Sequence, residues 1–289
     1  MPEDSWPPDQ DVEPDNVDEL LTLLLRRGAT HLVYRGQRDY DWPLVCTLSR
    51  ALREEAQAEG HNKYESIESM VVDPDFNRHV DEVETRLLRA FMEQAKGLTL
   101  PDLPDRTDRL AWWELMQHHR APTRLLDWTR SPFVGLWFAF WDQGCDRASD
   151  AALWIFDTRN SRLNHPREGR AASIPGWDNF FDDRDLQNRL AEKAIADNAL
   201  VPLAISPRVA VPRVIAEQSV LTLVPNIGAP THYNHFVLKT FSTRIRLRSS
   251  WKPRVLDLCR NMGITRAALF RDLDSIGDAL KETLTVARL

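Results

Sequence analysis

The stretch PTRLLDWTRSPFVGLWFAFW, residues 122–141, joins a short apolar strand pattern to an almost wholly apolar helix pattern. LLDWT is typical of a compact strand or turn, and Ser131 can cap the helix that Pro132 begins. A helix with so little polar surface has to be buried on most of its sides. We therefore predict a strand or turn that leads directly into a core helix.

The segments around this stretch alternate between helical and strand patterns. Residue spacing predicts helices over 16–28, 75–96, 107–120, 185–200, 253–263 and 273–285, strands over 31–37, 151–158, 214–224, 235–241 and 243–249, and a long loop over 158–185. Asn16 and Thr107 are expected to cap the first and third of these helices. We expect an α+β fold in which a helical N-terminal half packs on a mixed, mainly antiparallel sheet.

The composition is that of a soluble globular protein, with 289 residues, 43% hydrophobic and 28% charged. Cys46, Cys145 and Cys259 lie too far apart for a disulfide framework or a paired zinc motif, so we expect no metal and a cytoplasmic protein. The acidic start does not resemble a secretory signal, and the most apolar stretch, 132–141, is about half the length of a membrane span. We therefore expect no membrane partner.

Charge is distributed unevenly along the chain. Residues 1–18 are rich in carboxylates and proline and are predicted to form a flexible acidic tail. Residues 19–289 show no break in composition, so one domain is expected there. Its C-terminal part includes a basic segment over 239–260.

Arg244, Arg246 and Arg248 alternate on a predicted strand in this basic segment and so share one face. Three interpretations stay open: contact with the phosphate backbone of a nucleic acid, pairing with the acidic tail, and charged cover for an edge strand. The net charge of −6 argues against nucleic acid as the main partner. The oligomeric state is left open.

Three polar segments carry residues suited to ligand binding, and the first is Tyr34-Arg35-Gly36-Gln37. Arg35 offers a planar fork of five donors, which suits a phosphate or a carboxylate. Gly36 permits a sharp turn or the close approach of a ligand to the backbone. The alternative is a structural arginine paired with an acid.

The second segment, residues 117–129, gathers two imidazoles, two guanidiniums, a carboxylate and a hydroxyl between two predicted helices. Adjacent histidines on a helix point about 100° apart, which disfavours joint binding of a metal by His118 and His119. His118, Thr123, Arg124 and Asp127 are the candidate ligand contacts. The alternative is that Arg124 and Asp127 form a buried ion pair that holds the turn.

The third segment is the predicted strand around Glu217. Alternation places Glu217 and Ser219 on one face and Gln218 on the other. A carboxylate on the pocket side of a strand can stabilise a developing cation or act as a general base. A solvated glutamate on an edge strand is the alternative.

The order of these segments resembles the FRG domain family, which is named for its Phe/Tyr-Arg-Gly motif. Tyr34-Arg35-Gly36 is followed by QHxxxPTRLLDWTxSP and by an aromatic helix that ends in Phe138-Ala139. Gln218, after an arginine, also fits the family pattern. The resemblance covers roughly residues 28–225 and names the domain without specifying its chemistry.

The same order is similar to the three strand motifs of ADP-ribosyltransferases: aromatic-Arg-Gly, Ser-Thr-Ser before an aromatic helix, and Glu-x-Glu. This resemblance implies an ADP-ribosyltransferase-like strand order. It also implies that Arg35 holds a phosphate or ribose of NAD, that Thr129 or Ser131 orders the nicotinamide ribose, and that Glu217 faces the anomeric carbon. Ser219 stands where those enzymes have their second, catalytic glutamate.

The expected function is binding of an anionic, nucleotide-like ligand, with NAD as the candidate substrate. The expected activity is that of an NAD glycohydrolase or ADP-ribosyltransferase in a toxin or phage-defence setting; a non-catalytic binding or regulatory module and a nucleic-acid-acting protein are the alternatives. Arg35 and at least two of Arg124, Asp127 and Thr129 are expected to line one cleft. The full candidate set is Glu217 as the catalytic carboxylate, with Tyr34, Arg35, Gly36, Gln37, His118, Thr123, Arg124, Asp127, Thr129, Ser131 and Gln218 as ligand contacts.

Overall fold

The structure is a computed structural model of the chain. It describes residues 10–26, 31–58, 74–98, 103–141, 149–158, 183–197, 202–207, 212–225, 227, 239 and 242–271. The strand predicted over 235–241, the loop over 158–185 and the helix over 273–285 lie wholly or mostly outside the described residues.

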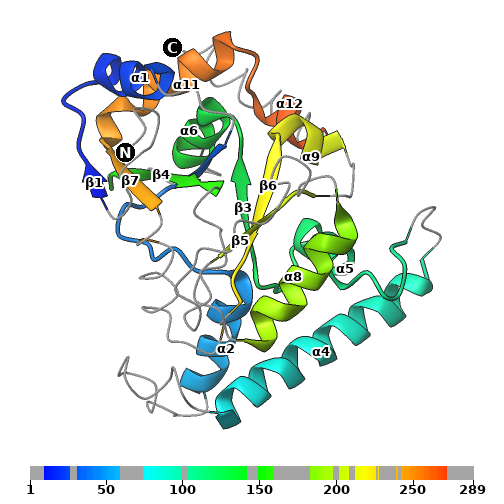
Figure 1. Ribbon diagram of the computed structural model, residues 1–289. Coiled ribbons are helices and arrows are strands. Elements are labelled where there is room, and N and C mark those ends of the chain that lie inside the picture. Colours follow the sequence, from blue (N-terminus) through cyan, green and yellow to red (C-terminus); the bar gives the residue numbers. More distant parts are fainter. Residues whose placement is uncertain are drawn as a thin grey trace.

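Helices and strands are interspersed along the described part of the chain (Figure 1). The strands are β1 (Gln10–Val12), β2 (Leu32–Gln37), β3 (Leu125–Thr129), β4 (Ala151–Asp157), β5 (Leu203–Ile205), β6 (Ser219–Leu223) and β7 (Ser242–Leu247). The helices are α1 (Val17–Arg26), α2 (Thr47–Ala58), α4 (Pro74–Lys96), α5 (Arg109–His118), α6 (Pro132–Phe140), α8 (Arg184–Ala196), α9 (Pro212–Glu217), α11 (Lys252–Asn261) and α12 (Arg266–Phe270), with a 3₁₀ turn, η3 (Ser249–Trp251).

The strands form one seven-stranded sheet in the order β1-β7-β4-β2-β3-β6-β5. Neighbouring strands are antiparallel except β1 and β7, which are parallel. The predicted α+β fold with a mixed, mainly antiparallel sheet is confirmed. β2 and β3 share a single register pair, Tyr34 opposite Thr129, so the sheet opens between these two strands beyond that pair.

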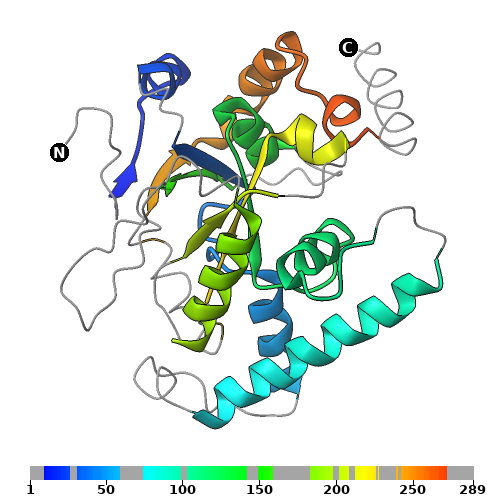
Figure 2. The same cartoon turned by 45° about the vertical axis from the view of Figure 1, so that its right-hand side comes forward.

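Helices cover both faces of the sheet. On one face, α1, α6, α11 and α12 pack on β2, β4 and β7, while α5 and α8 pack on β3, β5 and β6. On the other face, α2 and α4 supply apolar side chains. Figure 2 shows α5 between the long helix α4 and the strands. The strands alternate apolar side chains between these layers, as burial on both faces requires.

Helix α6 is the core element that its sequence predicts. Ser131 caps it by accepting a hydrogen bond from the backbone N–H of Val134, and Pro132 is its first residue. Its close contact with β2 depends on glycine, because a Cβ at Gly36 would lie 2.1 Å from the carbonyl oxygen of Gly135. The backbone that approaches Gly36 is therefore that of α6, and Gly36 lies within β2 rather than at a turn.

The region around Glu217 departs from the prediction of one strand over 214–224. Residues Pro212–Glu217 form helix α9, and β6 starts only at Ser219. Between them Gln218 has a φ of 49°, the left-handed conformation that commonly ends a helix. The β-branched residues Val214 and Ile215 favour a strand. Pro212, however, suits the first position of a helix, and the segment is helical in the structure.

The N-terminal segment is part of the sheet. β1 pairs with β7, and α1 begins at Val17, where Asn16 caps it through a hydrogen bond from the N–H of Glu19. The prediction of a flexible tail over 1–18 is therefore wrong for residues 10–18. Local composition misled here because the partners of β1 lie more than 200 residues away in the sequence.

Two further details of the helices differ from the sequence analysis. The N-cap of α5 is Asp108, whose side chain accepts from the N–H of Ala111, and not Thr107. Helix α12, capped by Thr265, was not predicted. It is only five residues long, so its apolar spacing is too short to give a helical signal.

Candidate functional site

A cleft of about 250 Å³ lies between the end of α5, the turn from α9 to β6, and the strands β3 and β6. Its lining includes several side chains that can carry charge or donate a hydrogen bond. The lining residues are Thr47, Glu114, Gln117, His118, Arg120, Ala121, Asp127, Pro207, Val214, Glu217, Ser219 and Leu221.

Asp127 is the exposed side chain of β3, and a chain of hydrogen bonds orients it in the cleft. Its Oδ2 accepts a 2.6 Å hydrogen bond from Nε2 of Gln117. Oε1 of Gln117 in turn accepts from the hydroxyl of Thr123, which is fully buried. Thr123 therefore lies in the core and orients the side-chain amide of Gln117, which in turn holds Asp127 in the cleft.

Glu217 comes from the end of α9, and its turn is tied to the turn that follows β3. The hydroxyl of Thr129 donates to the carbonyl oxygen of Glu217 at 2.6 Å, and the N–H of Arg130 donates to the carbonyl of Gln218 at 3.0 Å. Oγ of Ser219 lies 3.5 Å from Oε2 of Glu217, to which it donates. The Thr129 hydroxyl therefore positions Glu217.

Arg35 lies where the sheet opens between β2 and β3. Strand alternation puts its side chain on the face opposite Tyr34, and it is not among the residues that line the cleft. Its Nη1 donates to the carbonyl oxygen of Asp127 at 2.7 Å, while its buried Nε has no acceptor among the described residues. Burial lowers the pKa of the Arg35 guanidinium, and the Asp127 charge opposes this effect.

Arg124 pairs with Glu84 of α4, so the predicted pair with Asp127 is wrong. Its Nε lies 2.7 Å from Oε1 of Glu84 and its Nη2 2.5 Å from Oε2, and both side chains are buried. Nη1 donates to the carbonyl of Pro225 at 2.8 Å. Residues three apart on an extended chain face opposite ways, which separates Arg124 from Asp127.

The other residues of the Tyr-Arg-Gly segment serve the core. Tyr34 packs under α6, and burial raises its pKa to about 12. Oε1 of Gln37 accepts from the indole N–H of Trp154 at 2.6 Å, and its Nε2 donates to the carbonyl of Pro43 at 3.3 Å. The contacts that the structure assigns to these two side chains are internal.

The cleft brings together His118, Asp127 and Glu217 of the predicted set, with Ser219 beside them. Of Arg35, Arg124, Asp127 and Thr129, which were expected to share one cleft, only Asp127 lines it. Thr123, Thr129, Ser131 and Gln218 shape the surrounding turns, and Arg124, Tyr34, Gly36 and Gln37 belong to the core.

Sequence reasoning missed Glu114 and Arg120 as lining residues. Glu114 is buried, and its Oε1 lies 2.6 Å from Nη1 of Arg184. Arg120 belongs to the polar segment 117–129, but nothing in a single sequence distinguishes it from the neighbouring arginine. In the described part of the chain, no three His, Cys, Asp or Glu side chains are grouped as a metal site needs.

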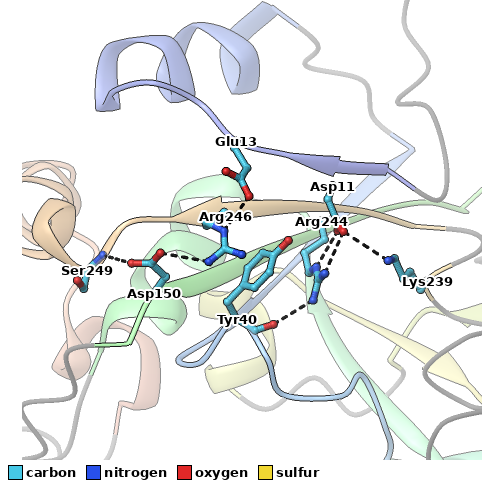
Figure 3. Close-up of polar contacts among 8 residues, drawn as sticks. All are labelled: Asp11, Glu13, Tyr40, Asp150, Lys239, Arg244, Arg246 and Ser249. Carbon is cyan, nitrogen blue, oxygen red and sulfur yellow. Dashed lines mark hydrogen bonds and ion pairs between the residues drawn. The ribbon is translucent and has the colours of Figure 1, made fainter.

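The basic strand β7 faces the acidic N-terminal segment (Figure 3). Nε and Nη2 of Arg244 lie 2.8 and 3.0 Å from the two carboxylate oxygens of Asp11. Arg246 pairs with Glu13 at 2.9 Å and with Asp150 at 3.3 Å. Pairing with the acidic segment, one of the three interpretations left open by the sequence, is therefore found for two of the three arginines.

Tyr40 completes this cluster. Its ring centre lies 3.8 Å from the guanidinium carbon of Arg244 and 3.7 Å from that of Arg246, so the ring stacks between two cations (Figure 3). Nη1 of Arg244 also donates to the carbonyl of Tyr40 at 3.1 Å. Arg248 is exposed and lies 5.6 Å from the ring of Trp251.

These features define the structural class of the protein. It is an α+β protein with a mixed sheet that opens between β2 and β3, and with a polar cleft beside that opening. Residues 30–147 match the family model of the FRG domain, so the chain contains an FRG domain, which spans β2 to α6 and holds seven of the twelve residues that line the cleft. Searches of curated proteins and of solved structures found no match. No described helix has the length and apolar character needed to cross a membrane.

Proposed function

We propose that the cleft binds the nicotinamide–ribose end of NAD. The carboxylates of the cleft then assist cleavage of the bond between the nicotinamide and the ribose. One observation carries the proposal: Asp127 and Glu217, from segments 90 residues apart in sequence, line the same cleft beside Ser219. The three segments that resemble the transferase motifs also lie on or next to adjacent strands, the third of them at the turn from α9 into β6. This adjacency is the arrangement that a single site built from them requires.

Cleavage of this bond needs few protein groups, chiefly a carboxylate beside the reacting carbon. When the bond between C1′ of the ribose and the nicotinamide nitrogen breaks, the electron pair leaves with neutral nicotinamide and the ribose becomes an oxocarbenium cation. A carboxylate fixed beside C1′ stabilises that cation more than the ground state. Water then adds to C1′ and gives up a proton to a carboxylate, which yields ADP-ribose, nicotinamide and one proton overall.

The size of the cleft limits how much ligand it encloses. Pockets for whole drug-sized ligands hold roughly 300–1,000 Å³. A cleft of about 250 Å³ suits one half of a dinucleotide, with the other half outside the rim. The two carboxylates favour the half that carries the cationic nicotinamide ring.

The test is release of nicotinamide from NAD by the purified chain, followed by chromatography. Glu217→Gln and Asp127→Asn should each reduce the rate at least about a hundredfold, because removal of an acid–base or charge-stabilising group costs that much. Glu192→Gln, on the exposed face of α8, is the matched control and should leave the rate unchanged. Release of nicotinamide at the wild-type rate by both cleft variants would contradict the proposal.

A second candidate function is binding without turnover. The observation that favours it is Ser219, which occupies the place of a second glutamate and donates its hydroxyl to Glu217. Saturable binding of NAD without nicotinamide release, lost in Glu217→Gln, would identify a binding or regulatory module.

A role in a toxin or phage-defence system follows only from the first candidate, because consumption of NAD arrests a cell. Induced expression of the wild-type chain, with Glu217→Gln as the control, should then stop growth and lower cellular NAD together. Normal growth with an unchanged cellular NAD level would contradict a role in a toxin or phage-defence system.

A further inference from the structure

We infer that Arg120 is the phosphate-binding residue of the cleft, so that its ligand is a nucleotide with a cationic ring at one end and a phosphate at the other. This inference rests on the proposed function and names the part of the ligand that the carboxylates do not explain. It assigns to Arg120 the role that the sequence motif suggests for Arg35.

The first support comes from the hydrogen-bond and ion-pair partners of the arginine side chains near the cleft. Arg35 donates to a backbone carbonyl, Arg124 is paired with Glu84, and Arg184 is paired with Glu114. Arg120 lines the cleft, is exposed, and has no side-chain partner among the described residues. Of these guanidiniums it is the one with its whole donor fork available to a ligand, and that fork matches a phosphate bidentately.

The second support is the backbone of Arg120. Its φ of 62° is the left-handed conformation, which usually falls to glycine or asparagine after a helix. The conformation is held by hydrogen bonds from the N–H of Arg120 to Gln117 at 3.0 Å and from the N–H of Ala121 to Met116 at 2.9 Å. A long charged residue at a position that suits glycine indicates a use for the side chain.

The third support is the balance of charge in the lining. Glu114 pairs with Arg184, and Asp127 and Glu217 are the other two carboxylates of the lining, while Arg120 is its only guanidinium among the described residues. Two carboxylates alone would repel an anionic nucleotide. A ligand with separated charges, such as nicotinamide mononucleotide, meets the carboxylates with its ring and the guanidinium with its phosphate.

The experiment compares two probes that differ only by that phosphate, nicotinamide mononucleotide and nicotinamide riboside, in binding by calorimetry. Wild type should bind the mononucleotide roughly tenfold to a hundredfold more tightly, as a charge-assisted contact provides. Arg120→Gly keeps the left-handed backbone and removes the guanidinium, so it should erase that preference without lowering the melting temperature. Arg120→Lys should restore only part of it, and Arg89→Gln on α4 should leave it intact.

Each other result has a definite meaning. Equal affinity of wild type for the two probes, or an unchanged preference in Arg120→Gly, overturns the inference and leaves the proposed function standing. Failure of wild type to bind either probe overturns both. Arg35→Lys could instead remove the preference for the mononucleotide over the riboside at an unchanged melting temperature. That result would identify Arg35 as the phosphate-binding residue and would also overturn the inference.

Discussion

Arg124 joins three parts of the fold through one buried side chain. Its guanidinium contacts both carboxylate oxygens of Glu84 on α4 and the carbonyl that follows β6. The ring of Trp113 on α5 lies 5.2 Å from its central carbon. A buried cation with all of these partners is stable only while they are present, because an uncompensated charge in the core is costly.

Removal of either partner should therefore destabilise the protein strongly. We expect Glu84→Gln to lower the free energy of unfolding by about 3–5 kcal/mol in urea titrations. Asp81→Asn is the control, since Asp81 is exposed and 3.9 Å from the same guanidinium, and should change it by less than about 0.5 kcal/mol. Equal effects of the two substitutions would show that the pair is not the cause.

Arg35 is expected to stabilise the fold and the cleft together. Its hydrogen bond to the carbonyl of Asp127 fills the opening between β2 and β3. Arg35→Lys should lower the free energy of unfolding by about 1–3 kcal/mol, because an ammonium cannot satisfy the same buried geometry, and should lower nicotinamide release with it. Arg50→Lys, an exposed change on α2, is the comparison in thermal melts. Activity lost at an unaltered melting temperature would instead indicate direct contact with ligand.

The contact between α6 and β2 depends on the absence of side chains. The Cβ of an alanine at Gly36 would lie 2.1 Å from one backbone atom of α6 and 2.4 Å from another, and backbone cannot move aside cheaply. Gly135 faces Tyr34 and Leu153 in the same contact, where an added Cβ would lie 3.1 and 2.8 Å from their side chains. The motif glycine therefore decides how closely helix and sheet approach.

Gly36→Ala should accordingly be among the most damaging small substitutions. We expect a loss above about 4 kcal/mol, or insoluble protein, because overlap in a packed core forces the whole helix to shift. Gly97→Ala at the end of α4 is the matched control, since its nearest neighbour would be at 3.4 Å, and should cost less than about 0.5 kcal/mol. A soluble Gly36→Ala protein with a wild-type melt would refute this account of the packing.

At the scale of the whole molecule, β1 ties the N-terminal segment to the C-terminal half of the sheet. Asp11 and Glu13 meet Arg244 and Arg246, and Tyr40 stacks between the two guanidiniums (Figure 3). The hydrogen bonds to Arg244, together with its charge and that of Lys239, hold the pKa of Asp11 below its usual range, against the effect of partial burial. The cluster therefore stabilises the fold in a way that depends on pH and salt.

The sign of this dependence follows from the lowered pKa. Asp11 stabilises the folded state above its ordinary pKa of 3.8, and the contribution is lost as the pH falls through the lower folded value. Asp11→Asn should thus cost up to about 1 kcal/mol at pH 7 in low salt, as partly exposed pairs do, and less in high salt. The difference from wild type should vanish at acid pH, measured by urea titration, with Asp41→Asn as control. A cost independent of pH would exclude the carboxylate charge as its source.

Local sequence determined much of the fold. Ser131 and Pro132 mark the start of α6, short β-type runs mark β2 and β4, the alternating arginines mark β7, and the apolar spacing of 75–96 marks α4. These signals are reliable because capping and periodicity depend on residues within about four positions of each other. The run from 122 to 141 also identified the FRG domain.

Tertiary structure alone decided which side chains meet. Glu84 and not Asp127 became the partner of Arg124, Glu217 ended a helix instead of lying on a strand, and Glu114 joined the cleft. Such choices depend on which faces pack together across intervals of 40 to more than 200 residues, where no local pattern operates. The sequence by itself identified the polar segments that build the site, and packing decided which of their side chains point into the cleft and which support it from the core.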